Sequence, residues 1–239
     1  MRVPGLVGRV RNLVWMAAFV SAVWCACGRV RADESGFFPV QVRLRVNQHI
    51  RSTSILAILK DETENIWRPY GVEIEWVDAK GGDAAAEAFA GFSVAAIIDR
   101  HPDGVADPDQ AVLGRASVPK DAAGALPIRV SFDATERMLL RRSASGPFVS
   151  ERDMGRALGR VLAHEIGHVL LAVRQHDRIG LMRAVFAPVE LGAPDRESFR
   201  LSREGLGRLR SRIEVMIAGA ETRSGEDPDG GACPFTAVP

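Results

Sequence analysis

Two histidines and a glutamate with the spacing of a metal site stand together at His164-Glu165-Ile166-Gly167-His168. Residues four apart on a helix lie on the same face, so both imidazoles could reach one metal ion. Zinc binds imidazole nitrogen, and Glu165, beside the first ligand, could take a proton from a zinc-activated water. The pentad therefore predicts a Zn²⁺ site with His164 and His168 as ligands and Glu165 as general base.

The alternative interpretation is a helix that carries two histidines by coincidence. The pentad lies in a strongly apolar stretch that includes Leu162, Val169 and Leu170. Burying two imidazoles and a carboxylate there would be costly without a metal or polar partners, so the flanks favour the metal site. Small residues along the same stretch would let other backbone approach closely: Gly159, Ala163 and Gly167.

A catalytic zinc ion needs a third protein ligand, and the downstream candidates are His176, Asp177 and Glu190. His176 lies eight residues past His168, beyond the expected end of the helix, so the chain can fold back to the metal. Glu190 would need a further helix, which the prolines and glycine of residues 187–195 disfavour. Asp177 is better suited to hydrogen-bond a ligand histidine. His176 is therefore the predicted third ligand.

The segment 164–182, HEIGHVLLAVRQHDRIGLM, resembles the zinc signature of the metzincin metallopeptidases, in particular the matrixin-like ones. The resemblance implies that His164, His168 and His176 hold the zinc ion and that Glu165 is the general base. It further implies that Met182 belongs to a methionine turn beneath the three imidazoles. It also implies an edge strand that pairs with extended peptide substrates and contains Leu113, Gly114, Arg115 and Ala116.

The segment departs from the family pattern in the turn after the helix. Leu171 stands where the family has a glycine, and Arg174 stands where the family has its third histidine. His176 comes two residues later than that position, and Met182 follows it sooner than in matrixins. We therefore expect a longer loop between the helix and the third ligand.

The period of the apolar residues predicts the strands that must surround this helix. Residues 40–46 and 72–76 alternate between apolar and polar, which is typical of half-buried strands. Residues 92–98 form a continuous apolar run, which indicates a buried central strand. Two more strands are expected at 112–118 and 128–132.

Apolar residues at helical spacing predict three helices. The first runs from Ser52 to the helix-breaking Pro69, the second spans 151–171 with Ser150 as its N-cap, and the last spans 202–217. Strands gathered before the last two helices predict a single α+β domain. The resemblance adds a zincin-like fold, with a mixed, twisted sheet of about five strands, an active-site helix and a C-terminal helix.

The N-terminal residues 1–32 have the features of a signal peptide. They contain five arginines, no acid and an apolar run that is short for a membrane span. Small residues precede a predicted cleavage after Ala32, which would make the protein secreted or periplasmic. An uncleaved anchor, or a lipoprotein modified at Cys27, is the alternative, and Trp24 disfavours the lipoprotein. Residues 33–222 would then form the metallopeptidase domain and 223–239 a flexible tail.

Charge and cysteine content exclude several classes of protein. The net charge of +1 falls to −4 without the five arginines of residues 1–32, so there is no basic field for nucleic acid. Three cysteines cannot build a disulfide framework, and only Cys233 lies outside the predicted signal peptide. We expect a peptide or protein substrate, and no stable membrane span after cleavage.

Two further alternatives concern metals and chemistry. The acid-rich loop 99–109 could hold a structural Ca²⁺, although its spacing is more typical of a solvated acidic loop. The zinc site could instead belong to a noncatalytic zinc- or peptide-binding module, or to a hydrolase of a non-peptide amide. Glu165 favours catalysis over a structural site, because a structural zinc ion needs no base.

Overall fold

The computed structural model describes residues 37–50, 52–78, 92–100, 112–118, 125–141 and 148–225. The predicted signal peptide, most of the loop 99–109 and Cys233 lie outside these residues. Among the described helices, none has the length and apolar character needed to cross a membrane.

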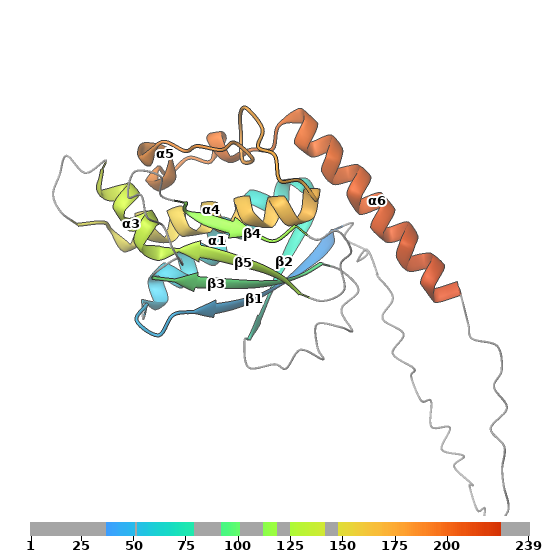
Figure 1. The fold of residues 1–239 in the computed structure, drawn as a ribbon, viewed down its shortest axis with the longest axis horizontal. Helices are drawn as coiled ribbons and strands as arrows, with labels where there is room; N and C mark the ends of the chain where they lie inside the picture. Colours follow the sequence, from blue (N-terminus) through green and yellow to red (C-terminus); the bar gives the residue numbers. More distant parts are fainter. Residues whose placement is uncertain are drawn as a thin grey trace, which may run out of the picture.

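The centre of the fold is a five-stranded mixed sheet with the order β2-β1-β3-β5-β4 (Figure 1). The strands β1, β2, β3 and β5 are parallel, whereas β4 is antiparallel to β5. Their bounds are β1 Phe38–Val46, β2 Val72–Asp78, β3 Phe92–Asp99, β4 Gly114–Ala116 and β5 Leu126–Ser131. The predicted α+β class with a mixed sheet of five strands is confirmed, although the strand expected at 112–118 keeps only three residues.

Two long helices, α1 (Thr53–Trp67) and α4 (Glu151–Leu171), pack closely against each other and against the sheet. Ser150 accepts a hydrogen bond from the backbone N–H of Asp153, which confirms it as the N-cap of α4. A Cβ atom at Gly159 would lie 2.7 Å from the carbonyl oxygen of Leu59. The glycine therefore allows α1 to approach α4 closely, in keeping with the expectation that the small residues of this stretch admit other backbone.

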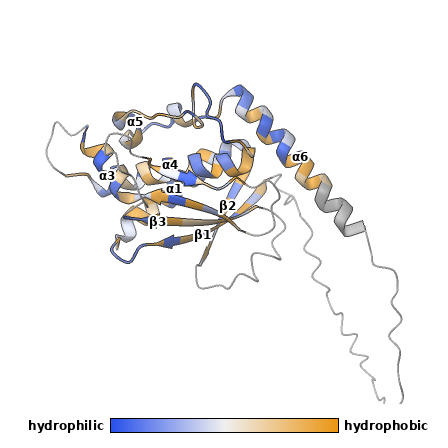
Figure 2. Ribbon diagram, in the orientation of Figure 1, coloured by the Kyte–Doolittle hydropathy of each residue, from blue (hydrophilic) through white to orange (hydrophobic). Residues whose placement is uncertain are grey.

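Four shorter elements and one long helix complete the chain: η1 Arg68–Tyr70, α3 Phe132–Leu140, α5 Pro188–Gly192, η2 Glu197–Phe199 and α6 Arg203–Gly225. In Figure 1, α6 runs away from the body of the molecule beyond its first turns. It extends past the predicted end at 217. Figure 2 shows both hydrophobic and hydrophilic residues along α6 and along the strands of the sheet.

Two expectations about these elements were wrong. A strand was expected to continue to Phe132, but α3 begins there because the Ser131 hydroxyl accepts the N–H of Ala134 and starts a helix. A helix was judged unfavourable within 187–195, yet α5 forms. Pro188 occupies its first turn, where no backbone N–H is needed, and the Glu190 carboxylate accepts the N–H of Ala187.

Candidate metal centre

Helix α4 carries the pentad into the interior, where His164, Glu165 and His168 are all buried. The four-residue spacing places both imidazoles on one face, with their Nε2 atoms 3.0 Å apart and their rings nearly perpendicular. The two side chains therefore converge on a single point beside the helix.

The hydrogen bonds of the Nδ1 atoms determine which ring nitrogen of each imidazole carries the proton. His164 Nδ1 lies 2.7 Å from the carbonyl oxygen of Leu181, and His168 Nδ1 lies 2.8 Å from that of Val173. A carbonyl only accepts, so each ring carries its proton on Nδ1 and a lone pair on Nε2. Two lone pairs 3.0 Å apart repel each other unless a cation lies near both.

This donor set fits a zinc ion. Two nitrogen ligands of a tetrahedral zinc ion are about 3.3 Å apart, close to the separation of the two Nε2 atoms. Burial, together with the neighbouring His168 and His176, lowers the pKa of His164 to about 4, against the opposing effect of the hydrogen bond to the Leu181 carbonyl. Burial lowers the pKa of His168 as well. Both imidazoles are thus neutral near pH 7, which is the form that binds metal.

His176 reaches the same point from the loop that follows α4. The helix ends at Leu171, and Ala172 adopts a left-handed conformation, with φ 51°, that reverses the chain. The His176 ring is exposed and stacks on His164 with ring centroids 5.3 Å apart. Potential ligand atoms of the three histidines all lie within 4.8 Å of one another, so they could hold one metal ion.

The segment that follows His176 packs against the pentad and helps to hold the histidines in position. Met182 is buried, and a Cβ atom at Gly167 would collide with its sulfur, so the methionine packs directly against the pentad. Gly180 has φ 78°, and the carbonyl oxygen of Arg200 occupies the space of a Cβ atom there. Leu181 N–H donates to that carbonyl at 2.8 Å, which fixes the residue whose own carbonyl accepts from His164.

Tyr70, the only tyrosine of the chain, connects the end of α1 with the segment around Leu201. Its hydroxyl oxygen accepts the backbone N–H of Leu201 at 2.8 Å, across 131 positions of sequence. Its ring also packs edge-on against Trp67, whose indole N–H donates to the carbonyl of Ala163. The end of α1 and the following η1 therefore contact both α4 and the segment that supports the turn of Met182.

Glu165 lies between α4 and the edge strand β4. A Cβ atom at Gly114 would come within 2.6 Å of its Oε1 atom, so only glycine leaves room for the carboxylate. Burial raises the pKa of Glu165 to about 8, against the opposing effects of a hydrogen bond from the Ala116 backbone and the charge of Arg115. The side chain therefore has a proton affinity suited to acid-base chemistry near neutral pH.

The strand β4 has one edge that pairs with no strand of the described residues. Ser131 N–H donates to the Leu113 carbonyl, and Ser117 N–H donates to the Pro127 carbonyl, so alternate residues of this segment face β5. The backbone groups of Gly114 and Ala116 therefore point to the other edge, beside Glu165.

The structure brings His164, His168, His176, Glu165 and Met182 together, with the strand residues 113–116 next to them. Glu190 is not among the residues that gather there, since its carboxylate pairs with Arg183 at 2.6 Å. Asp177 was expected to hydrogen-bond a ligand histidine, and that was wrong. Backbone carbonyls occupy the Nδ1 atoms of His164 and His168, and Asp177 bonds to Ser202 instead.

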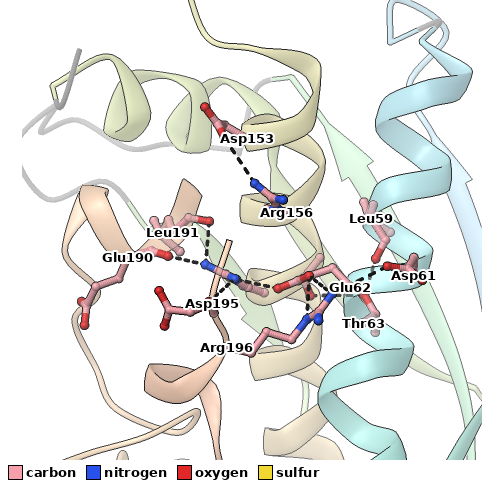
Figure 3. A network of polar contacts seen from close by, with 12 residues as sticks. Leu59, Asp61, Glu62, Thr63, Asp153, Arg156, Glu190, Leu191, Asp195 and Arg196 are labelled. Carbon is pink, nitrogen blue, oxygen red and sulfur yellow. Dashed lines mark hydrogen bonds and ion pairs between the residues drawn. The ribbon is translucent and has the colours of Figure 1, made fainter. Parts of the chain in front are cut away.

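Sequence reasoning missed a buried charge network one turn before His164. Arg160 and Glu62 are almost fully buried and form an ion pair at 2.7 Å, and Arg196 bonds the other carboxylate oxygen at 2.9 Å. Figure 3 shows this network between α1, α4 and the segment after α5. The Arg160 guanidinium also donates to three backbone carbonyls, those of Glu190, Leu191 and Asp195.

Aromatic rings connect this network with the histidines. The Arg160 guanidinium lies over the Phe199 ring, which stacks on Phe186 at 5.1 Å. Phe186 in turn meets His164 edge-on at 5.6 Å. The four-residue interval between Arg160 and His164 was the only sequence signal of this arrangement, because it places both on one face of α4.

The chain has limited similarity to known proteins. No protein-family model and no curated protein matches its sequence. Among solved structures, it is similar to archaemetzincin from Methanopyrus kandleri, with a TM-score of 0.46 and 16% sequence identity. That similarity covers 77% of this chain and 99% of the archaemetzincin chain.

Proposed function

We propose that this protein is a zinc-dependent metallopeptidase of the metzincin type. One observation carries the proposal: three imidazoles converge on one point beside a buried carboxylate and the edge of β4 that pairs with no strand of the described residues. His164, His168 and His176 would hold the ion. Zinc bound there would polarise the scissile carbonyl and acidify the attacking water.

Glu165 would act as the general base. Its position one residue after His164 suits a carboxylate that takes the proton of the attacking water and returns it to the leaving nitrogen. The hydrogen bond from the Ala116 backbone would hold the carboxylate in place between these two transfers. A purely structural zinc site would have no use for such a group.

The free edge of β4 would bind the substrate backbone. Gly114 offers its N–H and carbonyl, and Ala116 its carbonyl, to an extended peptide that would lie as a further strand of the sheet. This edge runs beside Glu165, so a peptide paired with it would place an amide bond near the carboxylate. Peptide recognition through backbone groups favours a peptidase over a hydrolase of small amides.

The substitution Glu165→Gln tests the role of the carboxylate. Glutamine keeps the shape of the side chain but cannot accept the proton, so kcat for peptide hydrolysis should fall by about 10²–10⁴-fold. Zinc content, measured by atomic absorption, should remain one ion per chain. The matched control is Glu197→Gln, an exposed glutamate in the C-terminal segment, which should hydrolyse peptides like the parent protein.

Hydrolysis retained by the Glu165→Gln variant would contradict this mechanism. A parent protein that binds zinc but cleaves no peptide would favour a noncatalytic zinc-binding module. Cleavage of small amides without cleavage of peptides would favour the hydrolase of a non-peptide amide.

A further inference from the structure

The third histidine is held differently from the other two. His164 and His168 are buried on α4, and each donates its Nδ1 proton to a backbone carbonyl. His176 is exposed and lies in a loop, and within the described residues its ring packs against the other two imidazoles and its ring nitrogens have no hydrogen-bond partner. Its position relative to them must therefore come from the backbone that carries it.

The next residue, Asp177, attaches this loop to neighbouring segments through hydrogen bonds and an ion pair. Its carboxylate is mostly buried, and Oδ2 accepts a hydrogen bond of 2.6 Å from the Ser202 hydroxyl. Its Oδ1 atom lies 3.5 Å from a guanidinium nitrogen of Arg208, and its backbone N–H donates to the Met182 carbonyl at 2.8 Å. One residue thus joins His176 to the segment of Met182 and to α6.

The two side chains that bind this carboxylate, those of Ser202 and Arg208, lie at and just before the start of α6. Ser202 immediately precedes the helix and accepts the N–H of Gly205 at 2.9 Å, as an N-cap does. The same hydroxyl donates its proton to Asp177. A Cβ atom at Gly205 would lie 3.4 Å from Oδ2, so the carboxylate sits against the first turn of α6.

We infer that Asp177 is a positioning residue through which α6 holds His176 at the distance from His164 and His168 that a shared metal ion requires. The inference rests on the metal site of the proposed function. A loop released from α6 would lose conformational entropy each time His176 bound the ion, so the affinity for zinc would fall. The residue acts on metal binding and touches neither substrate nor metal.

The test compares zinc affinities of full-length variants, measured by competition with a chromophoric chelator. Asp177→Ala should weaken zinc binding by about 10–100-fold, the usual effect of losing a group that orients a ligand. Asp177→Asn should retain most of the affinity, since its amide oxygen can still accept from Ser202. The matched control is Glu197→Ala, which breaks an exposed pair with Arg200 in the same C-terminal segment and should leave the affinity unchanged.

A double variant separates a positioning role from general destabilisation. In a His176→Ala background, Asp177→Ala should change zinc affinity by less than about twofold, because its effect passes through His176. The absorption spectrum of the Co²⁺-loaded protein should change in Asp177→Ala toward that of His176→Ala. Urea titration of the metal-free Asp177→Ala variant gives its folded fraction, which must remain high where affinity is measured.

Three results would overturn the inference: unchanged zinc affinity in Asp177→Ala, an equal further loss in the His176→Ala background, or an affinity loss in Asp177→Asn as large as in Asp177→Ala. None of these measurements uses peptide hydrolysis. A parent protein that binds zinc tightly but cleaves nothing would defeat the proposed function and leave this inference standing. Tight zinc binding that does not change when Asp177 is replaced would contradict this inference and leave the proposed function standing.

Discussion

At the scale of single residues, hydrogen bonds to carbonyls define the metal centre as much as the histidines do. Leu181 and Val173 each accept an Nδ1 proton, so that the two Nε2 lone pairs face each other at 3.0 Å. The HExxH spacing predicted that two imidazoles share a face. It could not predict their tautomers, because those depend on carbonyls of residues that follow the helix.

The carboxylate of Glu190, near the metal centre, makes the stability of the folded protein depend on pH. Partial burial opposes its ionisation, but hydrogen bonds from Arg183, Ala187 and Ser198 outweigh this and hold its pKa below the ordinary value of 4.5. A lowered pKa in the folded state adds stability above pH 4.5. That stability is lost as the pH falls through the lowered pKa, because the folded state then takes up the proton.

The variant Glu190→Gln should therefore be less stable than the parent at pH 7 and equally stable near pH 3. The expected difference at pH 7 is less than about 1 kcal/mol, since the pair with Arg183 is partly exposed. Urea unfolding of both proteins from pH 3 to 7 measures it. A difference that grows as the pH falls would show that the carboxylate is not stabilised by these partners.

At the scale of elements, sequence patterns predicted the helix α4 and its N-cap but not the turn by which the chain leaves the helix. Apolar residues at helical spacing fixed the span 151–171, and the structure confirms it. The short helices α3 and α5 were missed because side-chain caps at Ser131 and Glu190 decide them over a few residues. Local propensity averaged over a window does not register a single hydrogen bond.

The turn from α4 to His176 depends on Ala172 in a left-handed conformation that glycine adopts more easily. Ala172→Gly should stabilise the protein by about 1 kcal/mol, because it removes the steric cost of a Cβ atom at positive φ. The matched control is Ala57→Gly at an exposed position within α1, which should destabilise by about 0.5–1 kcal/mol. Thermal unfolding measures both, and a destabilising Ala172→Gly would mean that the turn is formed differently.

At the scale of the whole molecule, the buried ion pair of Glu62 and Arg160, together with the partly exposed Arg196, connects three parts of the chain. Glu62 lies on α1, Arg160 on α4, and the carbonyls that Arg160 binds lie at 190–195. The segment around α5 is thereby attached to the two central helices, and its Phe186 reaches His164. Apart from the four-residue interval between Arg160 and His164, no sequence pattern indicated this, because the many arginines of the chain do not reveal which one is buried.

Glu62→Gln should destabilise the protein by about 3–5 kcal/mol, since it leaves the Arg160 guanidinium buried without its counter-charge. The neighbouring Asp61→Asn changes an exposed carboxylate and should cost less than about 1 kcal/mol. Chemical denaturation of the two variants makes the comparison. Equal, small losses in both would show that the carbonyl partners alone satisfy Arg160.

In the proposed mechanism, three histidines hold a zinc ion and Glu165 takes the proton of the water that cleaves the peptide bond. Its most direct test is the hydrolysis of a mixed peptide library by the protein at known zinc occupancy, read by mass spectrometry. We predict cleavage that rises in proportion to zinc up to one ion per chain, disappears with a chelator and is nearly absent in Glu165→Gln. Cleavage that persists without zinc or in Glu165→Gln, or no cleavage at full occupancy, would contradict the account.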